Sequence, residues 1–368
     1  MLLYFWIYNG SIGSYYKAAA VDYSSSVIWV SRYDEPGEFE VYLRADKRIR
    51  RLAYQTGREC IITKEGSDTA MLVERIKLTC DPENGDYMTI SGRSVEAILA
   101  RRIAARWDSV KHRYLFTFSG TAENLIRQLI TDNIISPPEG QTWRKIDGFS
   151  LGEAQGYTDN VEAQLLGENL IDVIQALCKQ FGYGFRIRFD GDFVFELYKG
   201  TDRSAGQSEN PRLIFSPEMQ NVASIEWSYD EKPMRTVCFI GGEGEGYDRK
   251  VTLYGRANPP GAFGHEMWYD GSSLSSKTED GSTLTPEQYD ALLVDTAKTA
   301  LAEATSIYDM QTEAIPVAGY MYGVDYFLGD KITCMDDYGD SSDSIVTEVT
   351  EVEDESGIRV IPKFSNVG

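Results

Sequence analysis

Two stretches of the chain, residues 59–94 and residues 330–364, carry the same succession of β-strand patterns. Each has a short alternating strand, a longer alternating strand, and an acidic turn with Gly85 or Gly357 that leads into a third strand. Because side chains alternate between the two faces of a strand, each stretch is expected to fold as part of a small antiparallel barrel or sandwich. Two such barrels could occupy equivalent positions around an axis. The alternative is that any two β-meanders look alike.

Length and composition indicate a folded protein with more than one domain. At 368 residues the chain is too long for one ordinary core, so about two to four domains are expected. Its five cysteines are scattered and lack CxxC spacing, which indicates neither a disulfide framework nor a zinc site. The apolar segment at residues 1–10 is shorter than the roughly 18 apolar residues of a membrane-spanning helix. It is predicted to be a first strand, and no direct membrane insertion is expected.

The net charge of −21 is distributed unevenly. Residues 44–113 hold 15 Lys and Arg against 10 Asp and Glu, whereas residues 264–368 hold 5 against 21. An acidic surface repels the phosphates of nucleic acid, so no specific nucleic-acid binding is expected. The alternative is that the acidic surface serves only solubility.

The order of the predicted elements gives an α+β, multidomain fold class. Two small antiparallel β-barrels are joined by an α+β domain, with a helical insertion in the second barrel. Residues 1–108 are predicted to form the first β-barrel with a terminal helix, and residues 109–218 the α+β connecting domain. Residues 219–368 are predicted to form the second β-barrel, with the insertion at about 256–310.

Local signals predict four helices and a hairpin. Thr121 and Thr285 have the side chains of helix N-caps, and Pro286 suits a first helical position. An Asp-Gly pair between two alternating runs is the sequence of a tight β-turn. The predicted helices run from Ser94 to Trp107, from Thr121 to Ile134, from Gly167 to Gly182 and from Pro286 to Met310, and the hairpin turns at Asp190 and Gly191.

Catalytic chemistry has little support in the sequence. The chain has only two histidines, His112 and His265, and no GxSxG or comparable nucleophile motif accompanies them. His112 lies in a basic run and is predicted to be solvated. His265 has Glu266 and Asp270 nearby, which makes it a weak candidate for metal binding or acid-base chemistry.

Two loops superficially suggest ligand sites. The run GGEGEG at residues 241–246 lies between strands and carries Glu243 and Glu245, which would repel a phosphate, so a flexible hairpin tip is predicted. The acidic loop at residues 335–344 has enough carboxylates for calcium, but their spacing does not match a calcium-binding loop. No catalytic, cofactor-binding or metal-binding residues are therefore assigned. The four carboxylates of the acidic loop are Asp336, Asp337, Asp340 and Asp343.

Several stretches together resemble a known family. They include SRYDEPGEFEVYLRA, GRSVEAILARRI, the IFSPE stretch followed by GGEGEG, and LGDK before the last strands. With these stretches the chain resembles bacteriophage tail-tip and baseplate hub proteins, a group similar to the N-terminal hub region of tail-associated lysins and to contractile-tail central hubs. The similarity covers most of the chain, and none of its motifs is catalytic.

This resemblance implies a structural, non-enzymatic virion component without cofactors. It implies a homotrimer whose two barrels per chain form a pseudo-six-fold ring, with distal tail or tail-tube proteins above and tip, spike or receptor-binding proteins below. The protein would be assembled in the host bacterial cytoplasm and reside in the virion tail. Because the sequence stops at Gly368, directly after the last predicted strand, a bare hub is expected.

Other interpretations stay open at the level of sequence. A cell-wall hydrolase could use Glu266, His265 and Asp270, and a carbohydrate-binding tail component could use exposed aromatic residues. The particle could be a phage, a tail-like bacteriocin or an injection system, with a contractile or non-contractile tail. If a ring conducts DNA or a folded effector, the carboxylates of the second barrel are expected to face its lumen or its mouth, and the Arg-rich residues 44–113 to contact neighbouring subunits. The alternative places those carboxylates on the outer, solvated surface.

Overall fold

A computed structural model describes most of the chain. The described residues are 1–366 without 12, 55–59, 84, 105–106, 109–112, 115, 257–263, 279–280, 316, 337 and 339–340. They form a mixed α+β fold that consists mostly of sheets with a few helices. Within the described part of the chain, no helix has the length and apolar character needed to cross a membrane.

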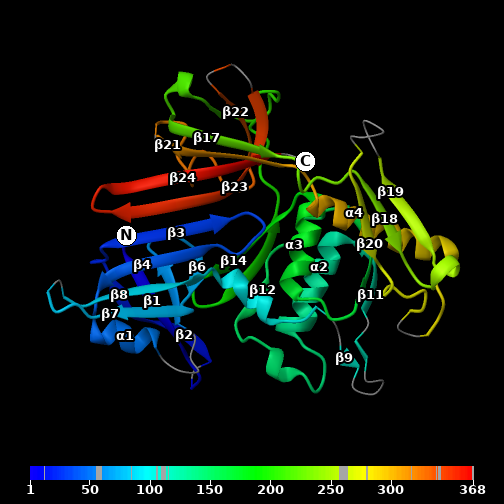
Figure 1. The fold of residues 1–368 in the computed structure, drawn as a ribbon. Helices are drawn as coiled ribbons and strands as arrows, with labels where there is room; N and C mark the ends of the chain where they lie inside the picture. Colours follow the sequence, from blue (N-terminus) through cyan, green and yellow to red (C-terminus); the bar gives the residue numbers. More distant parts are fainter. Residues whose placement is uncertain are drawn as a thin grey trace.

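The largest sheet contains strands from both ends of the chain. Its strand order is β17-β21-β24-β23-β3-β4-β8-β7, with β22 beside β23 and β16 beside β22. Figure 1 shows these strands in succession, from β17 near the top to β7 at the lower left. The strands are β17 (Val222–Asp230), β21 (Ile307–Ala314), β24 (Gly357–Asn366), β23 (Ser341–Asp354), β22 (Lys331–Met335), β16 (Ile214–Phe215), β3 (Ser26–Arg32), β4 (Glu38–Arg44), β8 (Tyr87–Arg93) and β7 (Arg75–Thr79).

Strands β1 to β8 and helix α1 make up what we call the first β unit. A second sheet of order β2-β1-β5-β6 packs against β3, β4 and β8, and Phe5, Trp29 and Val41 are buried in the core between them. The apolar start of the chain forms β1, as predicted. The remaining elements are β1 (Leu3–Asn9), β2 (Ser14–Val21), β5 (Cys60–Lys64), β6 (Ala70–Leu72) and α1 (Lys47–Ala53).

We call β16, β17 and β21 to β24 the second β unit, and it repeats the strand order of the first. The series β17-β21-β24-β23 corresponds to β3-β4-β8-β7. In the second unit the start of the long strand β23 pairs with the preceding strand β22. In the first unit the corresponding long strand is β6 followed by β7, and its start, β6, pairs with the preceding strand β5. This strand of the first unit is interrupted at Val73 and Glu74, between β6 and β7. The second unit has its own core, which includes Phe215, Tyr326 and Phe364.

The pairing of the described strands does not close either unit into a barrel. Instead, residues 27–32 of β3 pair antiparallel with residues 348–353 of β23, so the two β units share one continuous sheet. The sequence patterns predicted the alternating strands of each unit. They carry no information on which strand edges meet across about 300 residues.

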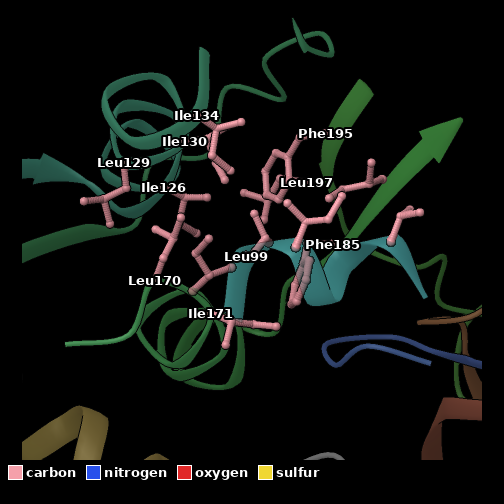
Figure 2. Close-up of a cluster of buried hydrophobic side chains, with 14 of the residues drawn as sticks. Leu99, Ile126, Leu129, Ile130, Ile134, Leu170, Ile171, Phe185, Phe195 and Leu197 are labelled. Atoms are coloured by element: carbon pink, nitrogen blue, oxygen red, sulfur yellow. The ribbon is translucent and has the colours of Figure 1, made fainter. Parts of the chain in front are cut away.

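An α+β part lies beside this sheet. Helix α2 (Ala122–Ile130) is capped by Thr121, and α3 (Leu170–Phe181) is capped by Asn169 and ends at Gly182 with a φ of 66°. The predicted hairpin forms β14 (Gly184–Phe189) and β15 (Phe193–Tyr198), and β15 also pairs with β12 (Phe149–Leu151). Figure 2 shows how apolar side chains from these elements and from the helical segments Val95–Arg101 and Thr131–Ile135 converge. They include Leu99, Ile126, Leu129, Ile130, Ile134, Leu170, Ile171, Phe185, Phe195 and Leu197.

The helix predicted from Ser94 to Trp107 is wrong in type and length. The structure has a 3-10 helix at Val95–Arg101, and Arg102 is already extended. The main chain then turns to pair with the start of α3, because Leu170 N donates to Arg102 O and Ala104 N donates to Glu168 O. These contacts between distant segments end the helix before the length that its local pattern predicts.

The predicted helix of the insertion packs against a small separate sheet. Strands β18 (Val237–Gly241) and β19 (Val251–Gly255), expected in the second barrel, form a separate sheet of order β19-β18-β20 with β20 (Glu266–Asp270). Helix α4 (Pro286–Glu303) covers this sheet and also packs against α3 and β13 (Asn160–Leu165). Its capping box of Thr285 and Gln288 agrees with the predicted start. The helix ends at Glu303, before the predicted Met310, because β21 begins at Ile307 and pairs with β17.

Candidate functional site

The residues considered for chemistry do not form a site. His265 Nδ1 lies 3.1 Å from Met234 O, so the imidazole contacts the main chain. Glu266 and Asp270 stand at opposite ends of β20, about 13 Å apart at strand rise, and Asp270 is ion-paired with Arg249. His112 lies outside the described residues. A hydrolytic centre built from His265, Glu266 and Asp270 is therefore not assembled.

The GGEGEG loop uses its polar groups internally. Strands β18 and β19 form the predicted hairpin around it, and Arg249 Nη2 donates to Gly241 O at 2.9 Å. Glu243 accepts hydrogen bonds from Ser275 Oγ and Ser276 N, both at 2.9 Å. Burial raises the pKa of Glu243, but the bonds from Ser276 and Ser275 outweigh it and leave the pKa lowered. This anionic, already bonded loop is unsuited to holding a phosphate.

The described carboxylates of the acidic loop, Asp336 and Asp343, already have partners within the fold. Asp343 accepts from Thr333 at 2.7 Å and lies 3.2 Å from Lys331 Nζ, and Asp336 accepts from Tyr338 N at 2.8 Å. Asp337 and Asp340 fall outside the part of the chain that the structure describes. Among the residues that it does describe, no group of three or more His, Cys, Asp or Glu could hold a metal ion.

The motifs of the resemblance converge instead on the junctions between the parts of the fold. Tyr33, from SRYDEP, is 5% exposed and touches all three parts. Its N–H donates to Thr347 O of the second β unit at 2.9 Å, and its carbonyl accepts from Phe185 N of the α+β part at 3.0 Å. Its ring lies where a Cβ on Gly184 or Gly329 would approach to 2.1 or 2.2 Å. Only glycine leaves room for the ring at those two positions.

Asp330, from LGDK, forms the second junction. The residue is 2% exposed, and its carboxylate accepts from Thr201 N at 2.7 Å, Arg203 Nε at 2.9 Å and Phe327 N at 3.1 Å. Thr201 and Arg203 belong to the segment that leaves the α+β part, whereas Asp330 directly precedes β22. A buried carboxylate with these three donors fastens the second β unit to the middle of the chain.

Glu96, from GRSVEA, fastens the first β unit to β14. Its carboxylate is buried and accepts from Ile187 N at 2.6 Å. Burial raises the pKa of Glu96, against the opposing effect of hydrogen bonds from Ser94 and Ile187. Ser94 Oγ in turn accepts from Gly37 N at 2.8 Å, so the motif links two loops of the first unit to the hairpin.

The seam between β3 and β23 joins the two β units directly. Glu348 Oε2 accepts from Arg32 Nε at 2.6 Å across it, and Glu351 forms an ion pair with Lys64. Beside the seam lies a groove of about 850 Å³, bordered by α3 and the end of α4. Asp34 lines it, and burial raises the pKa of that carboxyl. Cys178 also borders the groove, but its side chain is buried and burial raises the pKa of its thiol, which disfavours the reactive thiolate.

Comparison with known proteins agrees with a structural assignment. A family model described as siphovirus ReqiPepy6 Gp37-like protein matches residues 4–364. The chain belongs to this family. A search of curated proteins finds no match.

Solved structures of tail proteins share the fold over its whole length. A tail protein from Neisseria meningitidis MC58 has a TM-score of 0.60 and 13% identity, covering 100% of this chain and 97% of that chain. The 43 kDa tail protein of prophage MuSo2 from Shewanella oneidensis has a TM-score of 0.55 and 13% identity, and the match covers 99% of this chain and 98% of that chain. Prophage tail protein gp18 from Listeria monocytogenes EGD-e has a TM-score of 0.53 and 9% identity, and the match covers 99% of this chain and 94% of that chain. The resemblance to bacteriophage tail proteins is thus confirmed.

Proposed function

We propose that the protein is the structural hub of a phage tail tip or baseplate. In this proposal three chains form a ring that joins the tail tube to the tip or spike components. The carrying observation is the repeat of one strand order, β17-β21-β24-β23 and β3-β4-β8-β7, within a single chain. Two equivalent units per chain make six wall segments when three chains assemble, which adapts a three-fold tip to a six-fold tube.

The proposal includes the finer organisation expected from the sequence. Each β unit would complete a small barrel, residues 1–108 and 219–368 would be the barrel domains, and residues 109–218 would connect them. The packing of the sheet β2-β1-β5-β6 on β3, β4 and β8 supports a barrel-like first unit. The helix α4 and the sheet β19-β18-β20 would project from the second.

The proposed partners are the chain itself as a homotrimer, distal tail or tail-tube proteins above, and tip, spike or receptor-binding proteins below. The proposed location is the virion tail, after assembly in the host bacterial cytoplasm. We assign no enzymatic activity, because Glu266 and Asp270 stand at opposite ends of β20. Neither specific nucleic-acid binding nor direct membrane insertion is part of the proposal.

The mass in solution tests this proposal. Multi-angle light scattering of the purified protein should give three times the 41.3 kDa of one chain. Electron-microscopy averages should then show three-fold rings with six similar wall segments. A protein that stays monomeric at high micromolar concentration would contradict the ring. A zymogram in which the protein clears bacterial cell wall would favour the hydrolase instead.

A further inference from the structure

In the described part of the chain, the main run of the shared sheet, from β17 to β7, ends at two strand edges without a neighbouring strand. Within the described part of the chain, β17 pairs only with β21, and β7 pairs only with β8. Unpaired strand edges present free N–H and C=O groups that can bind another strand. Figure 1 shows these edges at the two ends of the stack of strands.

These free edges are the counterparts of the two edges that already meet inside the chain. By strand order, β17 corresponds to β3 and β7 corresponds to β23, and β3 pairs with β23. The sequence supports the first correspondence, since β3 runs into Tyr33-Asp34-Glu35 and β17 into Tyr229-Asp230-Glu231. Tyr33 is 5% exposed at the internal seam, whereas Tyr229 is 50% exposed. Tyr229 thus lacks a cover comparable to that of Tyr33.

The charges of the two free edges are complementary. Strand β7 carries exposed Arg75 and Lys77 and no acid, whereas β17 carries exposed Glu226 and ends at Asp230 with no base. Following the pairing across the sheet places Arg75 and Lys77 on the same face as the residues of the Arg32–Glu348 ion pair. Glu226 lies in one row with Gln311, Lys363 and Glu348, on that face too.

We propose that β7 of one copy of this chain pairs antiparallel with β17 of the next copy. This inference rests on the proposed function and names the contact that closes its ring. The contact repeats the β23–β3 seam between chains and keeps the charged face continuous, as strand register requires. Because it joins two different edges, it is a head-to-tail contact, which closes into a ring when the rotation per chain is one third of a turn. The occupant of each free edge is therefore a second copy of the chain.

Charge reversal at each edge tests the proposal. The first variant carries Arg75→Glu and Lys77→Glu, and the second carries Glu226→Lys and Ser228→Lys. Each should raise the concentration for half-assembly by about thirtyfold, because opposite cross-strand charges become like charges. A chain with all four substitutions should return to within about tenfold of the wild type. Edge variants that assemble like the wild type, or a combined variant no better than either alone, would overturn the proposal.

A matched control carries the same charge change away from the edge. Lys47→Glu with Arg51→Glu places two carboxylates on exposed positions of α1 and should leave assembly unchanged. If the control variant raises the concentration for half-assembly as much as the β7 variant does, the effect is not specific to the strand edge and the proposal is overturned.

Hydrogen exchange on the wild type tests the same contact without substitutions. Amides within residues 75–79 and 222–230 should gain protection when the protein is concentrated from monomer to trimer. A trimer in which both strands exchange as in the monomer would refute the edge contact alone. A wild type without any trimer would instead refute the proposed ring.

Discussion

Removing the Asp330 carboxylate should loosen the second β unit from the middle of the chain. Asp330→Ala leaves the Arg203 guanidinium, whose side chain is 17% exposed, without its buried partner. It also leaves Thr201 N and Phe327 N without an acceptor. Breaking a buried ion pair costs 3–5 kcal/mol, and the partial exposure of Arg203 favours the lower end, about 3 kcal/mol. At 1.4 kcal/mol per factor of ten, this is about a hundredfold in the local opening equilibrium.

Native-state hydrogen exchange measures that opening directly. Arg203 N donates to Lys331 O and Lys331 N donates to Thr201 O, so these amides report whether the two segments stay together. Their exchange should accelerate about a hundredfold in Asp330→Ala. In Asp330→Asn the exchange rates of these amides should lie between those of the wild type and of Asp330→Ala. The amide oxygen of the asparagine still accepts from Thr201 N, but its NH2 group faces the Arg203 guanidinium, which is also a donor.

An exposed ion pair supplies the control. Asp147 lies 3.3 Å from Lys145, and both side chains are more than half exposed, so Asp147→Ala should cost about 0.5 kcal/mol or less. If Asp330→Ala accelerates exchange no more than Asp147→Ala does, the junction role of Asp330 is refuted.

Three further predictions concern other parts of the molecule. Gly184→Ala should destabilise the fold, because the new Cβ would lie 2.1 Å from the ring of Tyr33; a melting temperature equal to that of the wild type would contradict this. The pKa of Glu96 is raised by burial, so its contribution to stability is present below about 4.5 and is lost as pH rises through its folded pKa. Urea titrations of Glu96→Gln should therefore differ from those of the wild type by an amount that changes above pH 4.5, and a constant difference would refute the shift. His265→Ala with Glu266→Ala should leave assembly and infection or killing unchanged, and loss of cell-wall clearing in this variant would overturn the structural assignment.

The sequence by itself determined the local elements of this protein. Alternation of apolar and polar residues predicted the strands of both β units, and Thr121 and Thr285 predicted the starts of two helices. These signals act within a few residues, through side-chain periodicity and capping hydrogen bonds. The order of the quoted motifs was sufficient for the resemblance to tail proteins.

Only the tertiary structure decided how distant segments meet. The union of β3 with β23, the end of the 3-10 helix at Arg101 and the separate sheet of β18 to β20 depend on contacts between residues far apart in the chain. The same holds for Tyr33, Glu96 and Asp330, whose burial no periodicity reveals. The sequence signal for the burial of Glu96 and Asp330 was a charged residue among apolar or glycine neighbours, as in VEAIL and LGDK. The partners of these buried charged residues are main-chain groups and an arginine on other elements. They come within hydrogen-bonding distance only when the chain has folded.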